Sequence, residues 1–187
     1  IGAKFTLGVT SGTTALYTAM AALEVGPGDE VILPAWTWYA CYDAIVLSGA
    51  LPVFAEIDES FDIDPNDLER KITPQTKVIM AVHLQGCPCD MDPILEIARK
   101  HKLRVLEDCA QCAGGRYKGK YVGTIGDIGI NSFQLSKTIT GPAGPAEGVG
   151  QAVERRDHRR LPAVLDEVGG RLDLGSHAAR REVPGGE

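Results

Sequence analysis

The chain has 187 residues, of which 44% are apolar and 24% charged, a composition typical of one globular domain. Its 25 acidic and 19 basic residues give a net charge of -6, which argues against a nucleic-acid-binding surface. The sequence contains neither an apolar run approaching the ~18 residues of a membrane span nor a visible secretory signal. Five cysteines, in a chain without such a signal, are typical of reduced thiols. We therefore expect a cytoplasmic protein with no nucleic-acid or membrane partner.

Helical patterns and apolar runs alternate along residues 13–133. A helix is expected at 13–25, entered from Ser11-Gly12. Another is expected at 94–101, with Asp92 as its N-cap and Pro93 in its first turn. Further helices are expected at 38–48 and 66–72, strands at 30–34, 52–57, 78–84, 103–106 and 128–133, and a hairpin at 117–121. This alternation predicts an α/β fold, a three-layer α/β/α domain with a mostly parallel sheet.

Composition changes near residue 140. Residues 141–187 contain no Lys, seven Arg, nine Gly and four Pro, and no Phe, Trp, Tyr, Ile, Met or Cys. Such a segment can bury little apolar surface to offset the entropy of ordering. We therefore expect one domain over residues 1–140, followed by a tail at 141–187 that is disordered or results from a shifted reading frame.

Residues 8–14 form a glycine-containing junction that leads into the first helix. Free backbone N–H groups at a helix N-terminus bind anions, and the hydroxyls of Ser11, Thr13 and Thr14 add donors. No Lys follows Gly12, so the motif is not a Walker A loop. The same residues are also typical of an ordinary capped helix, and that interpretation stays open.

Three further features indicate a ligand site. Asp108 follows an apolar strand, and ligands gather at the carboxyl ends of strands in open α/β sheets. Lys137 closes a strand–loop segment and offers an amine nucleophile. The aromatic residues Trp36, Trp38 and Tyr39 include rings that could stack on a planar ligand. The alternatives are a surface Asp, a solvated Lys and aromatic core packing.

Four cysteines offer a different kind of site. The motif Cys109-Ala110-Gln111-Cys112 is a CxxC pair, which is typical of zinc or redox sites. Cys87 and Cys89, however, are separated by one residue, whereas paired zinc ligands are usually separated by about two to four residues. His83 is expected to be a hydrogen-bonded histidine at a strand end. We expect no metal here and keep a small zinc-binding module as an alternative.

An anion cradle, a stacking aromatic, a carboxylate and an amine together form the protein side of a pyridoxal 5'-phosphate site. The sequence also resembles the DegT/StrS-type sugar aminotransferases, which have the aspartate-aminotransferase fold (fold type I). The similar stretches, in the family's order over residues 3–140, are SGTTAL, VILPAWTWYA, GALPVFAEID, FDIDPNDLERKIT, VHLQGCPCDMDPI, LRVLEDCAQCAGGRYKGKYVGTIGD and SFQLSKTIT. The resemblance implies that residues 1–140 are part of that fold's large domain.

The resemblance also implies a role for each site residue. Gly12 and Thr13 match the phosphate-binding turn, and Ser132 matches a phosphate-binding hydroxyl. Trp38 matches the ring-stacking aromatic, and Gln111 matches a residue near the cofactor's 3-hydroxyl. The catalytic residues implied are Asp108, which pairs with the pyridinium nitrogen, and Lys137, which forms the Schiff base.

The implied activity is transfer of an amino group from glutamate or glutamine to a keto sugar or keto cyclitol, in a homodimer. Some relatives carry His in place of the lysine and catalyse dehydration, so Lys137 favours transamination. Two alternatives remain besides this enzyme: an inactive truncated fragment of it, and the zinc-binding module.

Overall fold

The computed structural model describes residues 2–3, 6–134 and 136–139. The predicted tail at 141–187 lies outside these residues. A five-stranded parallel sheet forms the centre, in the order β2-β1-β3-β4-β7. Its strands are β1 (Glu30–Pro34), β2 (Leu51–Ala55), β3 (Thr76–Val82), β4 (Arg104–Asp108) and β7 (Ile128–Ile130).

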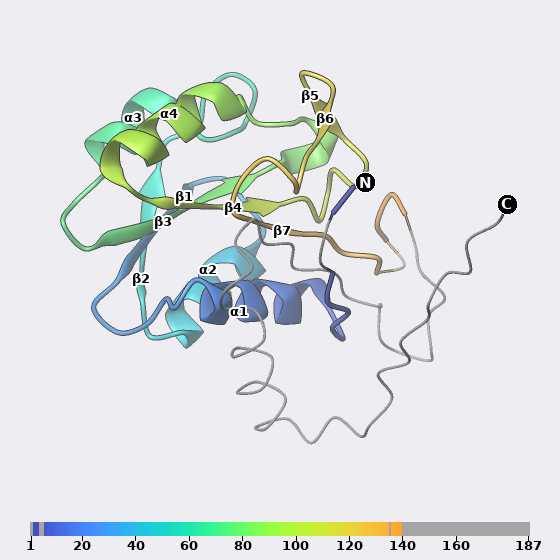
Figure 1. The fold of residues 1–187 in the computed structure, drawn as a ribbon, viewed down its shortest axis with the longest axis horizontal. Helices are drawn as coiled ribbons and strands as arrows, with labels where there is room; N and C mark the ends of the chain where they lie inside the picture. The colour runs from blue at the N-terminus through green and yellow to red at the C-terminus, as the bar shows by residue number, and fades with distance from the viewer. Residues whose placement is uncertain (1, 4–5, 135, 140–187) are drawn as a thin grey trace, which may run out of the picture.

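Helices cover both faces of this sheet. The helices α1 (Gly12–Ala22) and α2 (Tyr39–Leu47) lie on one face, and α3 (Pro65–Arg70) and α4 (Met91–His101) lie on the other (Figure 1). A short 3-10 turn, η1 (Leu84–Gly86), follows β3, and the predicted hairpin forms as β5 (Arg116–Tyr117) and β6 (Lys120–Tyr121). The predicted three-layer α/β/α domain is confirmed.

Alternation along the strands divides the interior into two cores. Successive strand side chains point to opposite faces of a sheet. In β3, Met80 therefore packs toward α1 and α2, whereas Ile79 packs toward α3 and α4. In β4, Leu106 and Val105 divide in the same way. The next residues of β4, Glu107 and Asp108, continue the alternation at the carboxyl edge.

The predicted element boundaries need correction at several ends. The strand predicted at 78–84 ends at Val82, because the chain turns into η1, where Gln85 has a φ of 50°. The strands predicted at 52–57 and 128–133 end at Ala55 and Ile130. The first helix ends at Ala22 rather than at Val25.

The predicted N-cap of α4 is wrong. Asp90, not Asp92, occupies that position, and its side chain makes no capping hydrogen bond. The Asp90 carboxylate instead accepts a hydrogen bond from the Tyr117 hydroxyl, and Asp92 pairs with Lys118. Since Asp92 already lies inside the first turn, it favours the helix through the dipole rather than through a cap.

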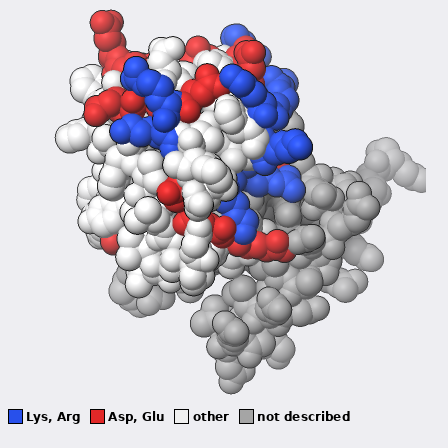
Figure 2. Space-filling view, turned by 90° about the vertical axis from the view of Figure 1, so that its left-hand side faces the viewer, with Lys and Arg blue, Asp and Glu red and all other residues white. Residues whose placement is uncertain are grey.

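Charged side chains of both signs are interspersed over the upper left of the face shown in Figure 2, and Lys and Arg predominate along its right-hand edge. Within the described part of the chain, no helix is long and apolar enough to span a membrane.

One close backbone approach fixes β7 against the preceding loop. A Cβ added at Gly129 would lie 2.1 Å from the carbonyl oxygen of Gly123 and 2.4 Å from its Cα. Because backbone atoms cannot move aside as a flexible side chain can, we expect Gly129→Ala to lower the free energy of unfolding by about 3 kcal/mol. Gly26→Ala is the matched control, since a Cβ there meets nothing within 4 Å. Urea unfolding of both variants tests this, and equal stabilities would contradict it.

Candidate functional site

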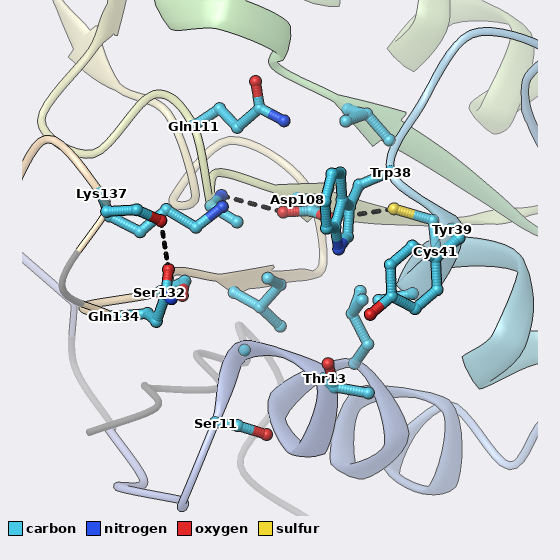
Figure 3. A pocket seen from close by; sticks show the side chains of 17 residues that line it. Ser11, Thr13, Trp38, Tyr39, Cys41, Asp108, Gln111, Ser132, Gln134 and Lys137 are labelled. Carbon is cyan, nitrogen blue, oxygen red and sulfur yellow. Dashed lines mark hydrogen bonds between the residues drawn. The ribbon is translucent and has the colours of Figure 1, made fainter. Parts of the chain in front are cut away.

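A cavity of about 470 Å³ opens at the carboxyl edge of the sheet. The N-terminal turns of α1 and α2, the ends of β3, β4 and β7, and residues of the segment 132–137 line it (Figure 3). All seven site residues predicted from the sequence line this cavity: Gly12, Thr13, Trp38, Asp108, Gln111, Ser132 and Lys137. The structure thus brings together residues that lie up to 125 positions apart in the sequence, from Gly12 to Lys137.

The N-terminus of α1 forms one end of the cavity. Ser11 caps the helix, because its Oγ accepts the amide N–H of Thr14 at 3.0 Å. The amides of Gly12 and Thr13 have no hydrogen-bond acceptor among the described residues and remain available to a ligand. A Cβ at Gly12 would lie 3.0 Å from the Cβ of Ser132, so the helix end and Ser132 are in close contact. A capped helix and an anion cradle are therefore compatible here.

Asp108 lies at the inner end of the cavity, with only 4% of its surface exposed. Its Oδ1 accepts the amide N–H of Ala110 at 2.9 Å, and its Oδ2 accepts the thiol of Cys41 at 3.2 Å. Burial raises the pKa of Asp108, although these two hydrogen bonds act in the opposite direction. The two hydrogen bonds offset only part of the free-energy cost of burying this carboxylate. A ligand with a cationic N–H group would offset the rest.

An aromatic wall stands on the α2 side of the cavity. The rings of Trp38 and Tyr39 have centroids 4.9 Å apart and are tilted by 40°. Both side chains are more than half exposed, so core packing does not explain them. Trp36 is equally exposed but does not line the cavity. The open faces of Trp38 and Tyr39 are available to a planar ligand.

Two polar side chains line the remaining sides. Lys137 extends toward Asp108 in Figure 3, and its backbone N–H donates to the carbonyl of Gln134 at 2.8 Å. Gln111 Oε1 accepts the amide N–H of Gln85 at 3.2 Å, which ties it to the turn after β3. The cavity thus offers an amine, a carboxylate, an aromatic face and a set of anion donors.

His83 and Glu107 form a separate buried pair on the opposite face of the sheet. His83 Nδ1 accepts the amide of Cys89 at 3.0 Å, so its proton lies on Nε2, which donates to Glu107 at 3.1 Å. Glu107 also accepts the amides of Gly123, Ile125 and Gly126 at 2.6–2.9 Å. His83 is therefore the hydrogen-bonded strand-end histidine that the sequence predicted.

The predicted cysteine motifs do not form a metal centre within the described residues. The three side chains there that approach a ligand set are His83, Glu107 and Cys109, whose ligand atoms lie within 4.8 Å of one another. Both ring nitrogens of His83 are already used in hydrogen bonds. All five cysteines are free thiols.

Sequence reasoning missed Cys41 and Gln134 as cavity residues. Cys41 was recognisable, because it stands three positions after Trp38 in a helix predicted to begin there, and such residues share a helix face. Gln134 carried no comparable signal.

Comparisons with known proteins match this chain to one family. The sequence model of the DegT/DnrJ/EryC1/StrS aminotransferase family matches residues 1–146. A GDP-perosamine synthase of Escherichia coli O157:H7 is 51% identical over 71% of this chain and 36% of its own. A putative L-glutamine:3-amino-2,3-dideoxy-scyllo-inosose aminotransferase of Micromonospora echinospora is 40% identical over 98% of this chain and 41% of its own. The chain therefore spans less than half the length of either relative.

Solved structures agree. NtdA from Bacillus subtilis, determined with bound cofactor PMP, superposes with a TM-score of 0.79 at 34% sequence identity. The match covers 89% of this chain and 37% of that one. Aminotransferases are thus similar to this chain in both sequence and fold.

Glu107 provides a stability test of this edge. Burial acts to raise the pKa of Glu107, but the hydrogen bonds from His83 and the loop amides outweigh it, and the pKa is lowered. Its contribution to stability is therefore present above the ordinary carboxyl pKa of about 4.3 and lost as the pH falls through the folded value. We expect Glu107→Gln to lose about 3 kcal/mol at neutral pH, because the amide nitrogen of Gln cannot accept the N–H groups that face it.

Urea unfolding at pH 7 and at decreasing pH measures this loss. Exposed Glu96→Gln is the control and should stay within about 0.5 kcal/mol of the parent chain. Equal stability of the two variants would show that Glu107 does not anchor the loop.

Proposed function

Because the chain belongs to the DegT/DnrJ/EryC1/StrS aminotransferase family, we propose that its cavity binds pyridoxal 5'-phosphate and transfers amino groups. The single observation that carries the proposal is the cavity itself, which Asp108 and Lys137 both line beside an aromatic wall and a helix N-terminus. The proposal concerns the activity of the whole enzyme. This chain spans less than half the length of the relatives that it matches.

The residues present fit the cofactor. The amides of Gly12 and Thr13, which have no acceptor among the described residues, and the hydroxyl of Ser132 would hold its phosphate. Trp38 would cover one face of the ring, and Gln111 would lie near the 3-hydroxyl. The buried carboxylate of Asp108 would pair with the ring nitrogen, where a cation relieves the cost of burial that raises its pKa.

Bound pyridoxal phosphate supplies an electron-accepting ring, which makes a proton on the substrate's α-carbon acidic. Asp108 would keep the ring nitrogen protonated, because its own charge favours a cation beside it. Lys137 would first hold the cofactor through its amine. When it is free, the amine of Lys137 would act as the general base that takes the proton from the donor's α-carbon and then as the acid that gives this proton up again.

We propose a keto sugar or keto cyclitol as the acceptor and glutamate or glutamine as the donor. The names of the relatives support these classes, since one is a GDP-perosamine synthase and another is named for L-glutamine and a scyllo-inosose. We also propose that a second copy of the chain completes the site, because Trp38 and Tyr39 leave it open on one side. Free cysteines support a cytoplasmic location.

Absorption spectroscopy tests cofactor binding. The full chain mixed with pyridoxal phosphate should develop a visible band that differs from the free cofactor and is absent in Lys137→Ala, because the variant lacks the amine. Exposed Lys71→Ala is the control and should keep the band. A spectrum of the parent chain equal to that of the free cofactor would contradict the proposed site.

The amino-donor half-reaction tests catalysis. Adding glutamate or glutamine to the loaded chain should convert the bound cofactor to its amine form and release the keto acid. Lys137→Ala should slow this conversion by at least about 10²-fold, the usual contribution of a positioned general base. A cofactor that stays bound but never converts would contradict an active aminotransferase and favour a non-catalytic fragment.

A further inference from the structure

Cys41 contacts the catalytic carboxylate although no role of the proposed site requires a thiol. It lies in the first turn of α2 with only 1% of its surface exposed. Its Sγ lies 3.2 Å from Oδ2 of Asp108, on the side opposite the amide of Ala110 (Figure 3). The hydroxyl of Thr37 in turn donates to Sγ at 3.2 Å.

These contacts orient the thiol. A thiol has a single hydrogen, and its sulfur can accept another hydrogen bond. Because Thr37 donates to the sulfur, the hydrogen of Cys41 remains for Asp108. The carboxylate is then held through both oxygens, by the thiol on Oδ2 and by the amide of Ala110 on Oδ1. Two donors on two oxygens fix the plane of the carboxylate.

The same contact connects two elements of the cavity. Cys41 belongs to the helical turn that follows Trp38 and Tyr39, whereas Asp108 ends β4. The hydrogen bond between them fixes the position of the aromatic wall relative to the Asp108 carboxylate. A ring that stacks on Trp38 must also present its nitrogen to Asp108, so this relative position decides how well both contacts form together.

We propose that Cys41 is a positioning residue, which holds the Asp108 carboxylate in the orientation that pairs with the cofactor's ring nitrogen. The proposal rests on the proposed function, since it concerns the same ligand. Burial and the nearby Asp108 charge raise the pKa of the Cys41 thiol well above its ordinary value, so the thiol keeps its hydrogen at neutral pH. The donated bond lowers the pKa of Asp108 against the effect of burial.

Substitutions in the full chain separate this role from simple packing. Cys41→Ala removes the donor, Cys41→Ser restores one, and Cys89→Ala removes a buried thiol that donates to the Val82 carbonyl instead. Titration with pyridoxal phosphate should give a dissociation constant about tenfold higher for Cys41→Ala, the effect of one lost charged hydrogen bond. Cys41→Ser and Cys89→Ala should stay within about threefold of the parent chain. A Cys89→Ala value as weak as that of Cys41→Ala would overturn the proposal.

A second measurement needs no cofactor. The carboxyl ¹³C resonance of Asp108, followed against pH in the unloaded chain, should show a higher pKa in Cys41→Ala than in the parent, Cys41→Ser or Cys89→Ala. An unchanged Asp108 pKa in Cys41→Ala would overturn the proposal even in a chain that binds no pyridoxal phosphate. Failure of the parent chain to bind would, by contrast, overturn only the proposed function. If Cys41→Ala does not fold, Thr37→Val provides the same test, with a rise of the same sign expected because the thiol loses its orientation.

Discussion

Two adjacent carboxylates end strand β4 of the central sheet, and strand geometry points them to opposite faces of the sheet. Asp108 faces the cavity beside α1 and α2, while Glu107 faces the second core beside His83. Burying two neighbouring acids in this way is costly unless each receives hydrogen bonds or a positive charge. How that cost is met at each position explains most of the architecture at this edge.

At Glu107, hydrogen bonds from the protein alone offset the free-energy cost of burying the carboxylate. Four donors from His83 and the loop at 123–126 surround its two oxygens, and its pKa is lowered as a result. This arrangement ties β3, β4 and the entry to β7 together through hydrogen bonds that the protein itself supplies. A rigid edge of this kind is what a site on the other face of the sheet needs in order to keep its geometry.

The protein compensates Asp108 only in part. An amide and a thiol donate to it, yet burial still raises its pKa. The remaining cost is met best by a cation that enters the cavity, and the Lys137 amine and the aromatic wall lie where such a ligand would sit. The proposed ligand-binding role of Asp108 rests on this contrast with Glu107, whose hydrogen bonds all come from the protein.

The sequence predicted the strand and helix order well, because apolar runs and helix patterns reflect burial that the structure keeps. Asp108 was predictable because it stands at the carboxyl end of a buried strand, and ligands collect at that edge. The cap at Asp92 was wrong, because local pattern does not reveal that Tyr117, from a distant hairpin, bonds to Asp90. The roles of Glu107 and Cys41 were missed for a similar reason, since the donors to Glu107 and the carboxylate that accepts from Cys41 lie 16 to 67 positions away along the chain.

The proposed role of Asp108 requires that a ligand cation complete the charge balance of its carboxylate. The most direct test is the pKa of its carboxyl group, followed by ¹³C resonance in the full chain with and without pyridoxal phosphate. Without the cofactor we expect a pKa above the ordinary value of about 3.9, and with the cofactor bound a pKa well below that value. An Asp108 pKa that does not change when the cofactor is bound would contradict the account.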